Sequence, residues 1–434
     1  MERPTIVPMP PLAVGCSLPW DAVVPDPVAA LDRARLELGE TFVVDSGADR
    51  YLFTFGPVGV AAFYALAEDR ASKGVADWRM LRRKLPDELF VGRRTLPHQL
   101  FGRADVSHFL THVERALDVA LDELGDQGTV DAFALTRRLG HRVGLASWGG
   151  PGAATGLRFE ALVAAFDTLD GSESFVRPDV MAAVAASGKT AEVKALATVT
   201  DQVGQARAEL PGCESDHPLF ARVVAAWADE SDEAAVRGVA GDVALLHVAS
   251  MSNLFAALGW ALVDLLAHPS ELLAVAAGDR PRTEACALES IRLAQRSIMC
   301  RYVLAPIYLD VGDAVLHVDR GTTVATLLPL TNATSGPGYD VWDPDRWSGR
   351  RLRDASALAA VELVTAFGHG RHTCPAQPFS LAAMTRSLTR LLTAYRFDPG
   401  WVDPPTPITG QIGGVARAAG PCPLSYRRSD GSGP

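Results

Sequence analysis

The segment spanning residues 231–267 constrains the fold more than any other part of the sequence. Ser231 or Asp232 is a suitable N-cap, and His268-Pro269 would end the helix. At 1.5 Å per residue the helix would be about 50 Å long. Residues 243–267 are apolar on nearly every face, so they must be buried in protein or in lipid.

Polar side chains interrupt this apolar run, and no positively charged flank favours insertion into a membrane. The polar residues are His247, Ser250, Ser252, Asn253 and Asp264. We therefore expect a central helix that crosses a large, mostly α-helical core.

Residues 367–376 form a second distinctive stretch, in which a basic, glycine-containing loop leads to Cys374. A helical pattern begins directly after it. A sulfur at a helix N-terminus meets unpaired N–H groups and the positive end of the helix dipole, and both favour a thiolate. A thiolate is a strongly electron-donating ligand for haem iron. Arg371 and His372 lie beside it and are suited to bind haem propionates.

Three other interpretations of this stretch fit its residues less well. A zinc site using His369, His372 and Cys374 lacks a fourth ligand, because no second Cys/His cluster is present in the sequence. A Cys–His nucleophile lacks a third residue to orient it. A cysteine with only a packing role does not explain the basic, glycine-rich approach. Haem ligation by Cys374 is therefore the prediction.

The same stretch resembles the haem-binding signature of the cytochrome P450 superfamily, and Ala376 departs from it where most members have glycine. Glu289 and Arg292 share a helix face at i, i+3. Together with Arg346 they resemble the structural triad of that superfamily, in the expected order before Cys374. The resemblance implies a mainly α fold with a small β region, in a single domain over residues 1–434.

The resemblance also implies a haem b cofactor with Cys374 as the iron ligand. Arg301, in an extended segment, stands where relatives place an arginine against a propionate. His98 lies in a basic stretch and is a further candidate for haem contact. The expected cofactor-binding residues are Phe367, Gly368, Arg371, His372, Arg301, Ala249 and His98.

The long helix departs from most oxygen-activating members, which carry an acid–threonine pair over the iron. Ser252 and Asn253 occupy those positions here. This run is similar to the branch of cholesterol 7α-hydroxylase and prostacyclin synthase, and the spacing from Arg292 to Arg301 also fits that branch. We expect Ser252 and Asn253 to be catalytic by holding a water that carries protons. The alternative for Asn253 is a core amide that bonds a helix carbonyl.

That branch contains both oxygen-inserting and rearranging enzymes, so the reaction type stays open. A haem protein without turnover is also possible, which makes three candidate functions. The first is a monooxygenase that acts on an apolar small molecule. The second is an isomerase or dehydratase that rearranges an oxidised or peroxide substrate without reductant. The third is a haem protein that senses or carries a ligand.

Composition limits the partners. The net charge of −10 disfavours nucleic acid and anionic membranes. The chain has no flavin or nicotinamide fingerprint, so a separate ferredoxin/ferredoxin reductase-type donor is expected. Six scattered cysteines are typical of a reduced, cytoplasmic protein. Residues 1–20 are proline-rich without a long apolar run, which predicts neither a signal peptide nor a membrane anchor and resembles the soluble bacterial type.

Further expectations concern local structure. Basic residues between 69 and 103 would form a docking face for an acidic redox partner, a propionate contact, or an ordinary solvated helix and loop surface. A disordered tail is expected over residues 429–434. A hairpin is expected over residues 41–55. Helices are expected over residues 26–38, 106–124, 130–146, 158–169, 180–186, 190–210 and 218–227.

Overall fold

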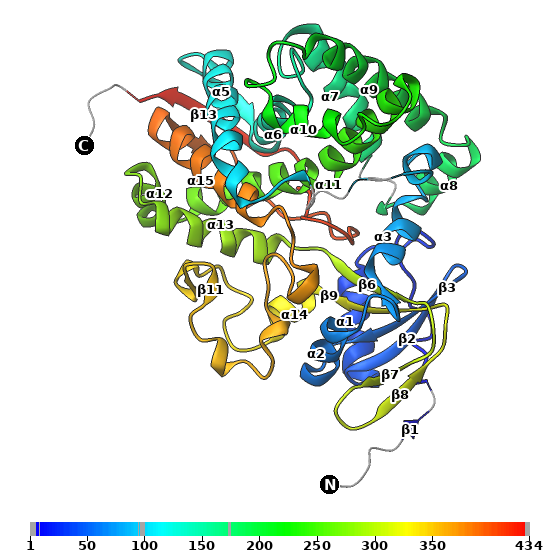
Figure 1. Cartoon of the computed structure of the whole chain (residues 1–434). Helices are drawn as coiled ribbons and strands as arrows, with labels where there is room; N and C mark the ends of the chain where they lie inside the picture. Colours follow the sequence, from blue (N-terminus) through cyan, green and yellow to red (C-terminus); the bar gives the residue numbers. More distant parts are fainter. Residues whose placement is uncertain (1–5, 8, 94, 96–99, 172–174, 430–434) are drawn as a thin grey trace.

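The computed structural model describes residues 6–7, 9–93, 95, 100–171 and 175–429 (Figure 1). Most helices gather on one side of the molecule, and the larger sheet lies on the other. The helices are α1 (Pro27–Leu38), α2 (Pro57–Ala65), α3 (Lys73–Leu81), α5 (Val106–Leu124), α6 (Ala132–Trp148), α7 (Gly156–Asp170), α8 (Pro178–Ala186), α9 (Thr190–Glu209), α10 (Pro218–Ala225), α11 (Asp232–Ala267), α12 (Pro269–Ala276), α13 (Arg280–Ala294), α14 (Leu328–Thr334) and α15 (Gln377–Ala394).

The strands form four small sheets. The largest has the order β2-β3-β9-β6-β4, and two three-stranded sheets have the orders β12-β13-β5 and β1-β8-β7. A short β10-β11 pair completes the set in the described part of the chain. The strands are β1 (Ile6–Val7), β2 (Thr41–Ser46), β3 (Asp49–Thr54), β4 (Ala71–Ser72), β5 (Gln127–Asp131), β6 (Ile298–Val303), β7 (Ile307–Asp310), β8 (Val315–Val318), β9 (Thr322–Leu327), β10 (Trp347–Ser348), β11 (Arg351–Leu352), β12 (Tyr395–Pro399) and β13 (Pro423–Arg428).

The long helix α11 is confirmed, with 36 residues and a Ser231 cap whose hydroxyl accepts from the Ala234 amide at 3.4 Å. It packs against α6, α9 and α13 in the middle of the helical layer. Among the described helices, α11 alone is long and apolar enough to cross a membrane, and 67% of that apolar window is buried inside the protein. The mainly α architecture with small sheets is therefore confirmed, with α11 as its central element.

Most of the expected helices and the hairpin are confirmed, but the expected helix over residues 130–146 starts two residues later. Val130 belongs to β5, where it pairs with Leu424 of β13. The Asp131 carboxylate then caps α6 by accepting from the amides of Phe133 and Ala134. The start of α6 is therefore set by the pairing of β5 with a strand that is distant in sequence. The hydrophobic periodicity of a short segment contains no information about such pairing.

The expectations about the basic stretch and the tail stay predictions. Some of the basic side chains between 69 and 103 are already paired or buried. Lys73, Arg79, Arg83 and Arg93 form ion pairs, and Lys84 is only 3% exposed. Ser429 is held by a bond from its amide to the carbonyl of Ala394, while residues 430–434 lie outside the described part. His98, an expected haem contact, also lies outside it.

Acid sensitivity is expected from His112 on α5, which is 3% exposed and stacked near His217. Burial, followed by the neighbouring His217, lowers the pKa of His112 to about 4. The unfolded chain has a histidine pKa of about 6.5. Between about pH 6.5 and pH 4 the unfolded chain binds a proton at His112 and the folded protein does not. The free energy of unfolding is therefore unaffected by His112 above pH 6.5 and falls as the pH drops from about 6.5 towards 4.

At pH 5 the loss attributable to His112 is about 2 kcal/mol. Urea unfolding at pH 7 and pH 5 measures it: His112→Gln should lose less free energy of unfolding on acidification than the parent. The control is His317→Gln, at a histidine whose side chain is 40% exposed. An equal acid-induced loss in His112→Gln and the parent would contradict the assignment.

Candidate functional site

Cys374 lies in a tight loop before α15. The Cys374 amide donates to the carbonyl of Phe367 at 2.8 Å, which closes the loop. Gly368 and Gly370 have φ values of 77° and 62°, in the left-handed region where glycine is strongly favoured. The Thr373 hydroxyl donates to the Gly370 carbonyl at 3.0 Å. These bonds hold the cysteine in one place ahead of the first turn of α15.

The surroundings of the Cys374 thiol have opposing effects on its pKa. Burial raises the pKa and dominates, while the amides of Ala376 and Gln377 and the cation of Lys73 lower it. The amides at the helix N-terminus thus favour the thiolate as expected, but in the protein alone burial outweighs them and the net pKa is raised. Metal coordination deprotonates a thiol outright. A half-buried sulfur with two amide donors thus fits a thiolate ligand of haem iron.

The neighbouring loop residues argue against zinc. His369 is bonded through Nε2 to the carbonyl of Val364 at 3.1 Å, and its ring meets Tyr64 edge to face. Within the described residues, no group of three or more His, Cys, Asp or Glu side chains is placed to hold a metal ion. Arg371 is exposed, and the side chain of His372 lies outside the description. Phe367 packs against the main core.

Glu289 and Arg292 are buried and form an ion-pair cluster with the partly buried Arg346, which confirms the expected triad. Arg292 and Glu289 are both 0% exposed and make two bonds of 2.7 and 2.8 Å. Arg346 Nε reaches Glu289 at 3.3 Å, and Trp347 Nε1 donates to the same carboxylate at 2.9 Å. Arg292 also donates to the carbonyl of Asn332 at 2.7 Å. The cluster ties α13 to the chain that precedes the Cys374 loop.

Arg301 on β6 is 2% exposed and is held by main-chain carbonyls from the last turn of α2 to the start of β4. Its guanidinium donates to Leu66 at 3.0 Å, to Ala71 at 3.4 Å and to Tyr64 at 3.2 Å. Burial lowers its pKa. These bonds use three of the five N–H donors of the guanidinium. The predicted propionate contact of Arg301 stays a prediction.

The two distal candidates on α11 are bonded to main-chain groups. Ser252 Oγ donates to the Val248 carbonyl at 3.0 Å. Asn253 Nδ2 donates to the Ala249 carbonyl at 3.2 Å, and Oδ1 accepts from the Val415 amide at 2.9 Å. Asn253 therefore joins the helix to residues 411–417. One N–H of the amide is left for a further partner.

Comparisons with known proteins agree with this geometry. No family model matches the sequence. The human 24-hydroxycholesterol 7-alpha-hydroxylase is 25% identical over 209 residues, 42% of this chain and 42% of that enzyme. Cytochrome P450 714C3 and 714C1 of Oryza sativa subsp. japonica are 34% and 30% identical over 115 and 151 residues, which are 26% and 32% of this chain and 21% and 29% of theirs.

Two solved structures match over nearly the whole chain. A cytochrome P450DA mutant heme domain has a TM-score of 0.73 at 17% identity, covering 98% of both chains. Retinoic acid bound cyanobacterial CYP120A1 has a TM-score of 0.71 at 15% identity, covering 97% of this chain and all of that one (100%). The chain therefore has the fold of the cytochrome P450 superfamily. The human relative is a 7-alpha-hydroxylase, which agrees with the branch expected from α11.

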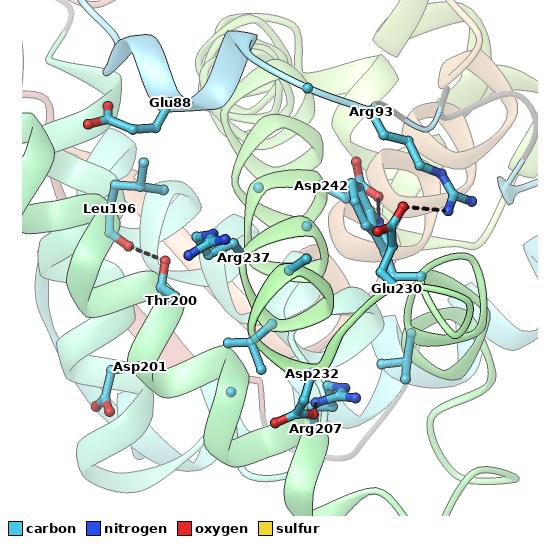
Figure 2. A pocket seen from close by; sticks show the side chains of 18 of the residues that line it. Glu88, Arg93, Leu196, Thr200, Asp201, Arg207, Glu230, Asp232, Arg237 and Asp242 are labelled. Carbon is cyan, nitrogen blue, oxygen red and sulfur yellow. Dashed lines mark hydrogen bonds and ion pairs between the residues drawn. The ribbon is translucent and has the colours of Figure 1, made fainter.

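The protein also has a large cavity between α9, α10, α11 and residues 87–93, with a volume of about 1830 Å³ (Figure 2). Leu196, Trp227 and Leu245 contribute apolar walls, and charged side chains such as Glu88 and Asp201 surround them. Gly238, Gly241 and Leu245 share one stripe of α11, which continues at helical spacing through Ala249 and Ser252. The cavity therefore follows the side of α11 that carries the distal residues.

Arg417 and Asp170 were missed at the sequence level, although they contact this region. Arg417 donates to the Ser252 carbonyl at 3.0 Å and to Asp170 at 2.6 Å. Asp170 ends α7, and Arg417 lies in an irregular segment far away in sequence. Neither residue belongs to a motif, so no signal in the sequence marks the pair.

Proposed function

We propose that this protein is a haem-thiolate monooxygenase of 434 residues in one domain, with haem b held by Cys374. The observation that carries the proposal is the half-buried Cys374 sulfur with two amide donors in a closed loop ahead of α15. When bound, haem supplies oxygen activation, favoured by the electron-donating thiolate. The protein supplies positioning, exclusion of water and the delivery of protons.

The proposed haem contacts come from both sides of the site. Phe367, Gly368, Arg371 and His372 would contact it from the Cys374 loop, and Ala249 from α11. The two unused N–H donors of Arg301 would bind a propionate by charge-assisted hydrogen bonds. His98 remains a proposed contact. Ser252 and Asn253 are proposed as the distal pair that orients a water.

The proposed substrate is an apolar small molecule that enters along the cavity beside α11. Its apolar walls support this class. The name of the human relative makes hydroxysterols a sensible first set of candidates. A ferredoxin/ferredoxin reductase-type donor in the cytoplasm would supply electrons, and no nucleic-acid partner is proposed.

A haem-thiolate isomerase or dehydratase is the second candidate, because α11 carries neither an acid nor a threonine at Ser252 and Asn253. Product formation from the candidate ligands, with and without an electron-donor system, separates the two. The monooxygenase requires the donor and incorporates one oxygen atom from O₂. Turnover of a peroxide substrate with no donor would establish the isomerase and overturn the first proposal.

Asn253→Ala is expected to lower the rate of product formation by roughly 10²-fold or more, since a positioned group for proton transfer is lost. In the monooxygenase, reducing equivalents would then leave as hydrogen peroxide while substrate binding survives. Peroxide yield per reducing equivalent measures this. Asn253→Asp keeps an acceptor for the Val415 amide and serves as the control for loop anchoring. Parent-like behaviour of both Asn253→Ala and Asn253→Thr would leave Asn253 a packing residue.

A further inference from the structure

The middle of α11 has an unusual number of side chains bonded to its main-chain carbonyls. Four carbonyls between residues 246 and 252 accept such a bond: Leu246 from Ser250, Val248 from Ser252, Ala249 from Asn253, and Ser252 from Arg417. Side-chain donors at these carbonyls compete with the helical N–H groups and bend helices. The helical hydrogen bonds at these carbonyls are therefore weakened in the middle of α11.

Arg417 differs from the other three donors because it comes from outside α11. Its guanidinium donates to the Ser252 carbonyl at 3.0 Å and to the Asp170 carboxylate at 2.6 Å. It also lies 4.5 Å from the centre of the Phe255 ring. The Arg417 amide donates to Gln411 at 2.8 Å. The guanidinium is thus fixed from three directions, and its position relative to Ser252 is set by Asp170.

The residues just before Arg417 fasten the same segment along α11. Asn253 accepts from the Val415 amide at 2.9 Å, and Trp260 Nε1 donates to the Ala416 carbonyl at 2.8 Å. A Cβ added to Gly414 would lie 2.6 Å from Asn253 Oδ1, so only glycine permits this approach. Three consecutive residues therefore contact α11 between Ser252 and Trp260.

The charges around the pair are costly to bury. Arg417 and Asp170 have side chains only 15% exposed, and Lys84, 3% exposed, interacts electrostatically with both. Burial lowers the pKa of Arg417. Apolar residues of similar size often stabilise a protein as well as a buried ion pair does. A contribution to packing therefore does not explain why these charged side chains are buried here. A role for Arg417 as a fixed hydrogen-bond donor to the Ser252 carbonyl does explain it.

We propose that Arg417, held by Asp170, is a positioning residue that competes with the helical hydrogen bond at the Ser252 carbonyl and so orients Ser252 and Asn253. This inference rests on the proposed function, in which these two residues hold the distal water. Asp170 is linked to the Ser252 carbonyl through Arg417, so an acidic group acts from α7 in a chain that has no acid at position 252. Neither Asp170 nor Arg417 is assigned a contact with substrate or cofactor.

Hydrogen exchange of the haem-loaded protein tests the proposal without turnover. In Arg417→Lys the cation can still pair with Asp170, but an ammonium lacks the fork that reaches two acceptors at once. The Ser252 carbonyl then accepts only from the Ala256 amide. Exchange in peptides covering residues 253–257 should therefore slow by about three- to tenfold. Asp170→Asn should also slow exchange over residues 253–257, but by a smaller factor. This second variant tests the proposal if Arg417→Lys folds poorly.

Glu209→Gln is the matched control. It removes a carboxylate that pairs at 2.7 Å with Arg158, an α7 residue whose side chain is also 15% exposed. Exchange over residues 253–257 should stay at the parent value in this variant. Unchanged or faster exchange in Arg417→Lys, or an equal change in Glu209→Gln, overturns the inference.

Activity provides a second, independent measurement. Arg417→Lys should release a larger share of reducing equivalents as hydrogen peroxide than the parent, at similar substrate affinity. If the parent protein lacks a thiolate-type haem spectrum, the proposed function fails before any variant is compared. If that spectrum is present and exchange does not slow, only the role of Arg417 fails.

Discussion

Cys374→Ser is expected to abolish the absorption band that the reduced, carbon-monoxide-bound protein should show for thiolate ligation. Serine offers a hard oxygen that stays protonated near neutral pH, whereas the cysteine thiolate is soft and strongly electron-donating. Turnover with an electron donor should fall by at least about a thousandfold, equivalent to about 4 kcal/mol of transition-state stabilisation. Absorption spectra of the purified proteins give the first result, and product formation gives the second.

Cys213→Ser is the matched control for this substitution. Cys213 is half-buried in a loop, and its thiol donates to the carbonyls of Glu209 and Leu210, which a serine hydroxyl can also do. The thiolate band should be unchanged in Cys213→Ser. A parent-like band in Cys374→Ser would remove the iron ligand from position 374 and, with it, the basis of the proposed function.

Some parts of this protein were predictable because a short stretch of sequence contains the cause. The length of α11 follows from its cap, its apolar run and the His268-Pro269 stop. The pairing of Glu289 with Arg292 follows from helical spacing, and both lie buried in one ion pair. The Cys374 loop follows from its glycines, which adopt the positive φ values that such a turn requires.

Other parts depend on contacts between distant segments and were not predictable. The net pKa of Cys374 is set by burial, which a sequence does not give. The start of α6 is set by the pairing of β5 with β13. Asn253 bonds both a helix carbonyl and the Val415 amide, and the second contact was predicted neither by the catalytic expectation nor by the core-amide alternative, in which Asn253 bonds a helix carbonyl and does nothing else.

Arg292→Ala is expected to yield little folded, haem-loaded protein. The change leaves the Glu289 carboxylate, which is 0% exposed, without its closest cation. It also removes the donor to the carbonyls of Asn332 and Tyr339, both at 2.7 Å. Removing one member of a buried ionic network costs about 3–5 kcal/mol, which is a large part of the stability of most proteins. The yield of soluble protein and its haem content measure the effect.

Helix α13 also carries a second glutamate in an ion pair, Glu284, which serves as a control for the effect of burying Glu289. Glu289→Gln and Glu284→Gln make the same chemical change five positions apart. Glu284 pairs with Arg350, whose side chain is 41% exposed, and such a surface pair contributes only about 0–1 kcal/mol. Glu289→Gln should therefore lower the midpoint of thermal unfolding far more than Glu284→Gln. Normal haem loading in Arg292→Ala with a selective loss of turnover would instead give the cluster a catalytic role, and equal midpoints in the two glutamine variants would show that burial of Glu289 does not determine its contribution.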